Sequence, residues 1–242
     1  MRFAIVREHM DFFYKNYFIE FDNLLSPDEV INLRKEIDGE LLQRCHSLGQ
    51  TLDKISPASI YMEGHDLWRT NNQIKKIVLR PKLAEIAATL TKVRPLRIGY
   101  DQIFRTSEIV RFFSNNEKPL PLNIPLSQMS SSTGVVCGLM LRLSPAEIKG
   151  ISSPLSTDGI NSTLTPWPSL PGNGIFFAPH ISLSLSYFFE NPNLYGLLIV
   201  YLEDNTVYVL EKNDPHTHAL KKLDYGFGDR LRNTTHPIVY HG

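Results

Sequence analysis

The chain has 242 residues, 42% of them hydrophobic, which is enough apolar material to bury a substantial core in one domain. Lys and Arg together number 25, as do Asp and Glu, so the formal net charge of zero attracts neither a nucleic acid nor an anionic membrane. The two cysteines exclude a disulfide framework and favour a reducing, cytoplasmic setting, and no apolar run approaches the ~18 residues of a membrane helix.

A helix with a complete start signal follows a short alternating strand, which is predicted over residues 18–21. Ser26 is placed to cap the helix, Pro27 fits its first position, and Glu29 stands where a capping box requires a carboxylate. Apolar residues then recur at helical spacing, which predicts an amphipathic helix as far as Cys45.

Two shorter helices are expected next, over residues 72–79 and from Pro81 to about residue 90. Pro81 disfavours helix in the residue before it and can itself begin the following helix. Residues 47–69 show no clear periodicity. Together these patterns predict that residues 1–95 form a mainly helical flank.

Apolar and polar residues alternate in short stretches from residue 96 onward, which is typical of strands. The expected strands lie near residues 96–104, 135–143, 174–177, 183–187 and 237–240. Residues 195–202 and 206–210, with a polar turn between them, predict a β-hairpin. The order of elements indicates one α+β domain, 1–242, with a double-stranded β-helix (jelly roll) over 96–242 flanked by the N-terminal helices.

A long loop is expected over residues 144–173, which are rich in Ser, Pro, Thr and Gly and lack periodicity. Loops of this length in compact domains are usually either lids over a functional site or disordered insertions. Trp167, which lies between two prolines, is placed to anchor the loop to the body, or to make a simple packing contact.

Residues 11–38, which include Asn23-Leu-Leu-Ser-Pro-Asp-Glu-Val30, resemble the opening of phytanoyl-CoA dioxygenase-like proteins. The later order of elements is similar as well, with helices to residue 90, a strand over 97–104 and then the β-helix. In that family two histidines and one carboxylate hold Fe(II), and an arginine binds 2-oxoglutarate. The resemblance therefore implies a 2-oxoglutarate-dependent dioxygenase that hydroxylates a small or lipid-like molecule.

The resemblance places the distal half of such a site near the C-terminal end. His216 or His218 stands where the family's late histidine is expected, and Asp214 is a candidate third ligand. Arg230 and Arg232 lie at the distance along the chain expected for the arginine that binds 2-oxoglutarate. The alternative for residues 214–218 is a polar turn, since Asp-Pro favours turn initiation.

The family's early His-x-Asp pair is missing, because residues 105–135, where it is expected, contain no histidine. The sequence has one literal His-x-Asp, at His9 and Asp11, in what we interpret as a solvated terminal segment. His65-Asp66 is interpreted as a hydrogen-bonding pair in a loop. We therefore expect a catalytically silent relative without cofactors, or an enzyme whose metal site is completed by another carboxylate.

A non-enzymatic role is the second hypothesis, because the chain is also similar to a divalent-cation-dependent regulator. That likeness implies an iron-responsive transcriptional regulator, or another protein that binds DNA or a protein partner. Lys75, Lys76, Arg80 and Lys82 form a small basic cluster that can contact phosphates. A solvated helix face is the plainer interpretation, and the zero net charge argues against DNA.

Overall fold

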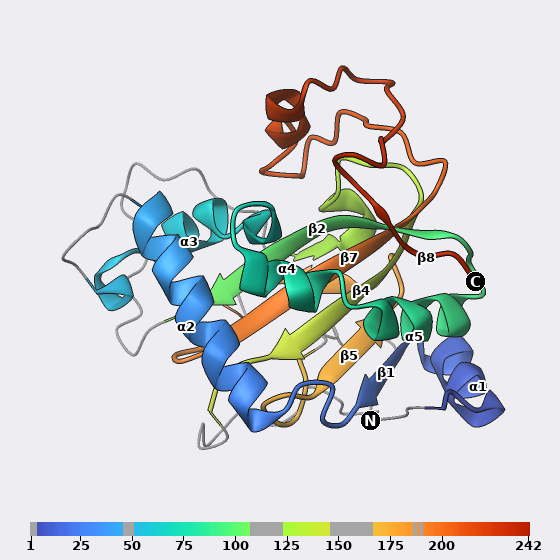
Figure 1. Cartoon of the computed structure of the whole chain (residues 1–242), viewed down its shortest axis with the longest axis horizontal. Coiled ribbons are helices and arrows are strands. Elements are labelled where there is room, and N and C mark those ends of the chain that lie inside the picture. Colours follow the sequence, from blue (N-terminus) through green and yellow to red (C-terminus); the bar gives the residue numbers. More distant parts are fainter. Residues whose placement is uncertain (1–3, 46–50, 107–122, 146–166, 186–187, 189–190) are drawn as a thin grey trace.

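The computed structural model describes residues 4–45, 51–106, 123–145, 167–185, 188 and 191–242 (Figure 1). Its helices are α1 (Arg7–Asn16), α2 (Pro27–Arg44), α3 (Pro57–Glu63), α4 (Asn72–Val78) and α5 (Pro81–Thr91). Its strands are β1 (Phe18–Phe21), β2 (Leu96–Arg105), β3 (Asn123–Pro125), β4 (Val135–Arg142), β5 (Gly174–Phe177), β6 (Ser182–Ser184), β7 (Tyr195–Glu203) and β8 (Ile238–Tyr240). None of the described helices is long and apolar enough to cross a membrane.

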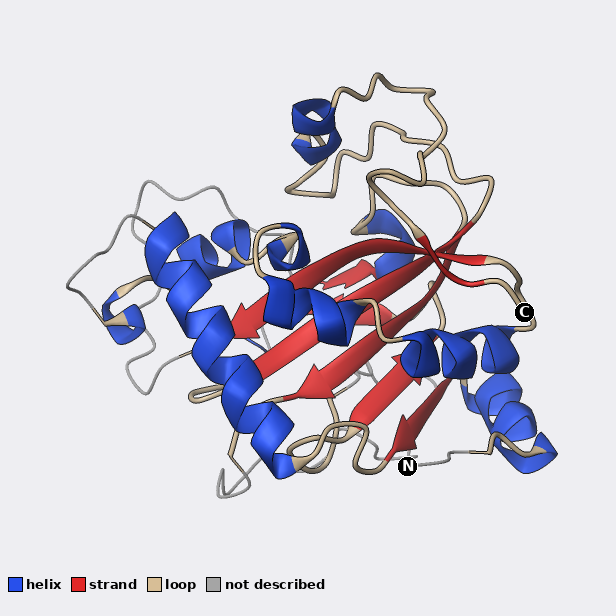
Figure 2. Cartoon of the chain, in the orientation of Figure 1, coloured by secondary structure: helices blue, strands red, loops and turns tan. Residues whose placement is uncertain are grey.

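The larger sheet of the described part has six strands in the order β1-β5-β4-β7-β2-β8, and every neighbouring pair is antiparallel. A second sheet consists of β3 and β6. Helices α2, α4 and α5 lie across one face of the larger sheet (Figures 1 and 2). Strands neighbouring in space are mostly distant in sequence, which is the crossing pattern of a jelly roll rather than of a meander.

Two apolar cores result from this arrangement, one on each face of the larger sheet. The first joins the buried faces of the helices, for example Ile37 and Ile86, to sheet residues such as Ile199. The second lies between the two sheets and includes Phe177 and Trp167. The fold is therefore α+β with a jelly-roll-like sheet, and the described part of its second sheet has two strands, fewer than a complete double-stranded β-helix requires.

The helix with the complete start signal is confirmed as α2. Ser26 Oγ accepts from the Glu29 backbone N at 3.2 Å, and Glu29 Oε2 accepts from the Ser26 backbone N at 2.8 Å. Helices α4 and α5 are confirmed as well. Helices α1 and α3 were not predicted, although Ser56-Pro57 repeats the Ser-Pro signal and Ser56 Oγ caps α3 through the Ser59 N at 3.1 Å.

The predicted hairpin is wrong in its second half. Strand β7 forms as expected, but residues 206–209 leave it and pair with residues 131–133. The Thr133 N donates to the Val207 O at 2.9 Å, and the Val209 N donates to the Ser131 O at 3.1 Å. In a jelly roll the chain leaves one sheet and pairs elsewhere in this way. The apolar pattern of residues 206–209 is the same whether they fold back on β7 or pair with residues 131–133, so the sequence does not distinguish the two.

The predicted loop at 144–173 lies mostly outside the described residues. Trp167, at its described end, is buried with 2% of its surface exposed, as expected for an anchor. Its ring packs against the backbone of Gly196, where an added Cβ would lie 2.7 Å from Trp167 Cζ3. Glycine at that position of β7 therefore makes room for the indole.

Candidate functional site

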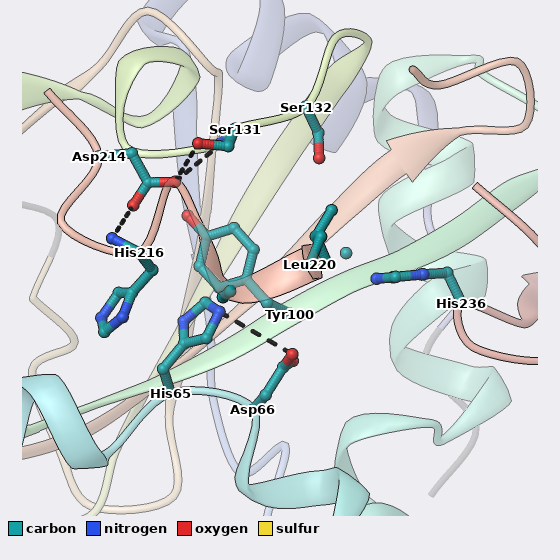
Figure 3. Close-up of a pocket in the computed structure, with 11 residues that line it drawn as sticks. His65, Asp66, Tyr100, Ser131, Ser132, Asp214, His216, Leu220 and His236 are labelled. Carbon is teal, nitrogen blue, oxygen red and sulfur yellow. Dashed lines mark hydrogen bonds and ion pairs between the residues drawn. The ribbon is translucent and has the colours of Figure 1, made fainter. Parts of the chain in front are cut away.

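A small polar cavity, with a volume of about 20 Å³, lies where the C-terminal excursion, residues 206–236, meets the body of the protein (Figure 3). That volume holds roughly one water molecule. Its polar lining comes from the turn after α3, from β2, from the segment before β4 and from the excursion: His65, Asp66, Tyr100, Ser131, Ser132, Asp214, His216 and His236. The cavity therefore collects side chains from both ends of the sequence.

The turn that carries His65 and Asp66 is held on one side by Asp101 of β2. The Asp101 carboxylate is fully buried and accepts from the backbone N of Leu67 at 3.2 Å and of Trp68 at 3.0 Å. Burial, and next the nearby Asp66 carboxylate, raises the pKa of Asp101 to about 7. Asp101 thus works as a structural acceptor that fixes the turn to the sheet.

Arg44, at the end of α2, holds the same turn from the other side. Its guanidinium donates to the backbone O of Glu63 at 3.1 Å, of His65 at 2.7 Å and of Asp66 at 3.2 Å. It also donates to Thr70 Oγ1 at 2.8 Å. A single cation therefore binds the last carbonyl group of α3 and two carbonyl groups of the turn that follows it.

The two carboxylates beside the cavity are occupied by hydrogen bonds. Asp66 accepts from Trp68 Nε1 at 3.2 Å and from Arg69 Nε at 2.7 Å. Asp214 accepts from the backbone N and the Oγ of Ser131, at 2.9 and 2.7 Å, and from the His216 backbone N at 2.8 Å. Burial raises the pKa of Asp214 to about 6. Asp214 thereby ties the excursion to the segment before β4.

The imidazoles of His65 and His216 stack with ring centroids 4.2 Å apart and an interplanar angle of 15°. Tyr61 and Tyr100 flank the stack, 5.6 Å from His216 and 5.0 Å from His65. His65 Nδ1 and His216 Nε2 are buried without a hydrogen-bonding partner among the described residues. Burial lowers the pKa of His65 to about 3 and of His216 to about 2, so both rings are neutral at pH 7.

His236 is held in one tautomer. Arg69 Nη2 lies 2.9 Å from His236 Nε2, and because a guanidinium only donates, this nitrogen must accept. The ring proton is then on Nδ1, which faces Thr235 Oγ1 at 3.1 Å and Tyr225 Oη at 3.3 Å. Burial, and next the Arg69 charge, lowers the pKa of His236 to about 3.

The structure divides the predicted site residues. Asp214 and His216 line the cavity. The His218 and Arg230 side chains are exposed, and neither lines it. Arg232 is also exposed and is turned away from the cavity, with its guanidinium 4.4 Å from the Tyr225 ring centre. The predicted ligands and predicted 2-oxoglutarate arginines are therefore not brought together in this arrangement.

The literal His-x-Asp at His9 and Asp11 falls on helix α1, where residues two apart point in different directions. His9 Nδ1 accepts from the Val6 backbone N at 3.2 Å, and Asp11 lies 3.7 Å from Arg7 on the helix surface. The segment that we interpreted as solvated is helical, with Asp11 exposed and His9 half-buried, and these two side chains do not form a pair.

An Fe(II) centre with 2-oxoglutarate does not fit these residues. The lone pair of an imidazole nitrogen lies in the plane of the ring. In two nearly parallel stacked rings these lone pairs do not point at a common position, so the rings cannot both bind one ion at a metal–nitrogen distance of ~2.1 Å. Among the described residues, no group of three or more His, Cys, Asp or Glu side chains is arranged to hold a metal ion. The cavity, at about 20 Å³, is also far smaller than the roughly 300 Å³ of the smaller ligand pockets.

Sequence reasoning missed His236 and Tyr100 as parts of this cluster and treated His65 as a loop residue. The sequence does contain a signal for His65, since a histidine next to an aspartate is a common polar pair. No local pattern links these three residues, because the cavity forms only when β2 and the excursion pack together.

The chain matches no protein-family model and none of the curated proteins. Among solved structures it is similar to the non-heme alpha-ketoglutarate-dependent carbocyclase SnoK from nogalamycin biosynthesis, with 14% identity, 96% of each chain covered and a TM-score of 0.63. It is equally similar to the epimerase SnoN of the same biosynthesis, with 12% identity, 97% of this chain and 98% of that chain covered, and a TM-score of 0.63.

SnoN has also been solved in complex with Fe3+, alpha-ketoglutarate and nogalamycin RO. CT296 from Chlamydia trachomatis matches with 15% identity over 84% of this chain and 99% of that chain, at a TM-score of 0.48, which is too low to define a shared fold. The likeness to SnoK and SnoN shows that this chain has the fold of the non-heme iron, 2-oxoglutarate-dependent enzymes.

Proposed function

We propose that this chain is a catalytically silent relative of the iron and 2-oxoglutarate-dependent oxygenases, a protein that keeps their fold and acts through binding. The observation that carries this proposal is the filled space between its two sheets. In ligand-binding barrels this space is a cavity of several hundred Å³, lined by a few convergent polar groups. In this chain large apolar side chains occupy it.

Two glycines mark how tightly the interior is filled. An added Cβ at Gly138 of β4 would lie 2.5 Å from Phe177 Cζ, and one at Gly196 of β7 would lie 2.7 Å from Trp167 Cζ3. Phe188 packs against Trp167 with ring centroids 5.5 Å apart. These aromatic side chains reach the strand backbones, so the interior is closely packed beside Gly138 and Gly196.

The competing function is an active dioxygenase acting on a small or lipid-like substrate. It would use Fe(II) held by Asp214 with His216 or His218, and 2-oxoglutarate held by Arg230 or Arg232. The shared fold and the ligands of SnoN favour it. The hydrogen bonds that occupy Asp214 and the stacking of His216 on His65 oppose it.

An anaerobic titration with Fe(II), with and without 2-oxoglutarate, separates these two functions. The silent protein is expected to give no metal-to-ligand charge-transfer band and only background binding of iron. His216→Ala and His218→Ala provide matched variants, since one residue lines the cavity and the other is exposed. A band that needs both ligands and disappears in His216→Ala would establish a working oxygenase site and overturn the proposal.

DNA binding by the basic cluster receives little support from its geometry. Arg80 pairs with Glu29 at 2.5 Å, and Lys82 pairs with Glu85 at 2.9 Å, so neither offers an uncompensated charge. Lys75 lies 5.7 Å from the centre of the Trp68 ring. Because two of the four cations are paired with carboxylates, little positive charge is left to bind a phosphate backbone. We therefore favour a small molecule or a protein as the partner.

A further inference from the structure

A groove much larger than the histidine cavity lies between α2 and the α4–α5 corner. Its volume is about 460 Å³, which falls within the size range of small-molecule pockets. Figure 1 shows α2 and α4 on the same face of the sheet, and their residues are in contact. The groove uses none of the residues considered above for iron or 2-oxoglutarate.

The base of the groove is apolar. Leu33 of α2 and Ile77 of α4 line it, and they are 3% and 7% exposed. Asn32 and Gln73, one from each helix, are exposed residues of its lining and provide amide groups. Leu33 and Ile77 thus form a small apolar floor, and the other residues that line the groove are polar or charged.

The acidic side chains of the groove are already engaged. Glu29 accepts from Arg80 Nη2 at 2.5 Å through one oxygen and from the Ser26 N at 2.8 Å through the other. Glu36 accepts from Asn71 Nδ2 at 3.0 Å. The ion pair with Arg80 compensates the charge of Glu29, whereas the amide hydrogen bond leaves Glu36 with its negative charge.

The lysines of the groove are not compensated in the same way. Lys35 has no hydrogen bond or ion pair to any described residue, and Lys76 donates only to the Gln73 side-chain amide, at 3.0 Å. Both are exposed. With Arg80 and Glu29 paired, Lys35 and Lys76 outweigh the single charge of Glu36, so the lining has a net positive charge that is complementary to an anion.

We propose that this groove binds a small organic anion, with its acidic group at Lys35 and Lys76 and its apolar part on Leu33 and Ile77. The inference goes beyond the silent role proposed above and does not depend on it. An acidic helix from a partner protein is the other occupant that such chemistry suits. The compact volume favours the small molecule.

Anilinonaphthalenesulfonate, an anion with an aromatic body that fluoresces in apolar sites, is a suitable probe. Saturable binding of one molecule per chain is expected. The double variant Lys35→Gln, Lys76→Gln should weaken it by about tenfold, the effect of removing two modest charge interactions. Lys75→Gln, a change on α4 outside the groove, is the matched control and should leave binding within about twofold.

Competition experiments identify the occupant. Octanoate should displace the probe, whereas octanol, which lacks the charge, should not. Binding that is unsaturable, or equal in the double variant and the wild type, would overturn the proposal. So would displacement by an acidic amphipathic peptide without displacement by octanoate, since the groove would then be a protein-docking site. Circular dichroism and the Tm of each variant verify that the exposed substitutions leave the fold intact.

Discussion

His65 and His216 stack ring on ring, 4.2 Å between centroids, although one lies in the turn after α3 and the other in the C-terminal excursion. Because both rings are buried and uncharged, the contact joins the excursion to the body through dispersion and not through an ion pair. The two rings are nearly parallel, with 15° between their planes, so the junction is a packing contact.

The filled interior predicts opposite effects for two glycine-to-alanine changes. Gly138→Ala should lower the free energy of unfolding by roughly 1–3 kcal/mol, because the new Cβ at 2.5 Å would displace the Phe177 ring. Gly39→Ala, inside α2 with no atom within 4 Å of its Cβ, should raise it by about 1 kcal/mol through helix propensity.

Urea denaturation of the two variants and the wild type measures both effects. If Gly138→Ala were as stable as the wild type, the space around β4 would be open enough to admit a ligand, and the silent role would lose its main support. Unchanged m values would show that the substitutions act on the folded state.

Local signals in the sequence were enough to predict most of the elements. The Ser-Pro start of α2, the proline at the start of α5, the alternation in β4 and the β-branched and aromatic residues of β7 are all local signals. The partners of the strands could not be obtained in this way. Residues 206–209 have the pattern of a strand. Their pairing partners, which include Ser132 and Arg230, are distant in sequence or lie outside the predicted hairpin, so a local pattern does not identify them.

The candidate site was less predictable than the fold for the same physical reason. The family resemblance singled out Asp214 and His216 as candidate ligands, and the structure does place them at the cavity. Their roles depend on contacts with Ser131 and His65, which are distant in sequence. Spacing identifies residues capable of binding a metal, but not whether their oxygens and nitrogens are already occupied.

Arg44 is expected to be a major stabilising residue of the turn that carries His65. Arg44→Met should lower the free energy of unfolding by about 2–4 kcal/mol, because three backbone carbonyl groups lose a charged donor. Arg7→Met is the control, since Arg7 is highly exposed and pairs with Asp11 at 3.7 Å, and its effect should stay below about 0.5 kcal/mol. Equal effects of the two changes would contradict the anchoring role of Arg44.

The two thiols should differ in reactivity. Burial raises the pKa of both thiols, but Cys137 is fully buried in β4, whereas Cys45 is half-buried at the end of α2. An aromatic disulfide reagent is expected to modify Cys45 in the folded protein and Cys137 only after unfolding. The Cys45→Ser variant should then show no reaction without denaturant, and a reaction in that variant would mean that β4 opens readily.

The stability of the protein should depend on pH through His216. Its folded pKa, about 2, lies below the ~6.5 of an unfolded histidine, so below about pH 6.5 only the unfolded chain takes up the proton. The free energy of unfolding therefore falls as the pH falls, by up to about 1.4 kcal/mol per pH unit from this one group. Asp214, with a pKa raised to about 6, acts in the opposite direction between about pH 4 and 6.

Comparison with His216→Phe isolates the histidine, because the variant keeps an aromatic ring beside His65 and retains Asp214, so the aspartate's contribution should largely cancel in the difference. Between about pH 6 and 4 the wild type should lose stability more steeply than the variant, by about 1 kcal/mol per pH unit. Urea midpoints at closely spaced pH values measure this difference in slope. Parallel curves would mean that His216 titrates normally in the folded protein, so that the ring is solvated and free of the stack with His65.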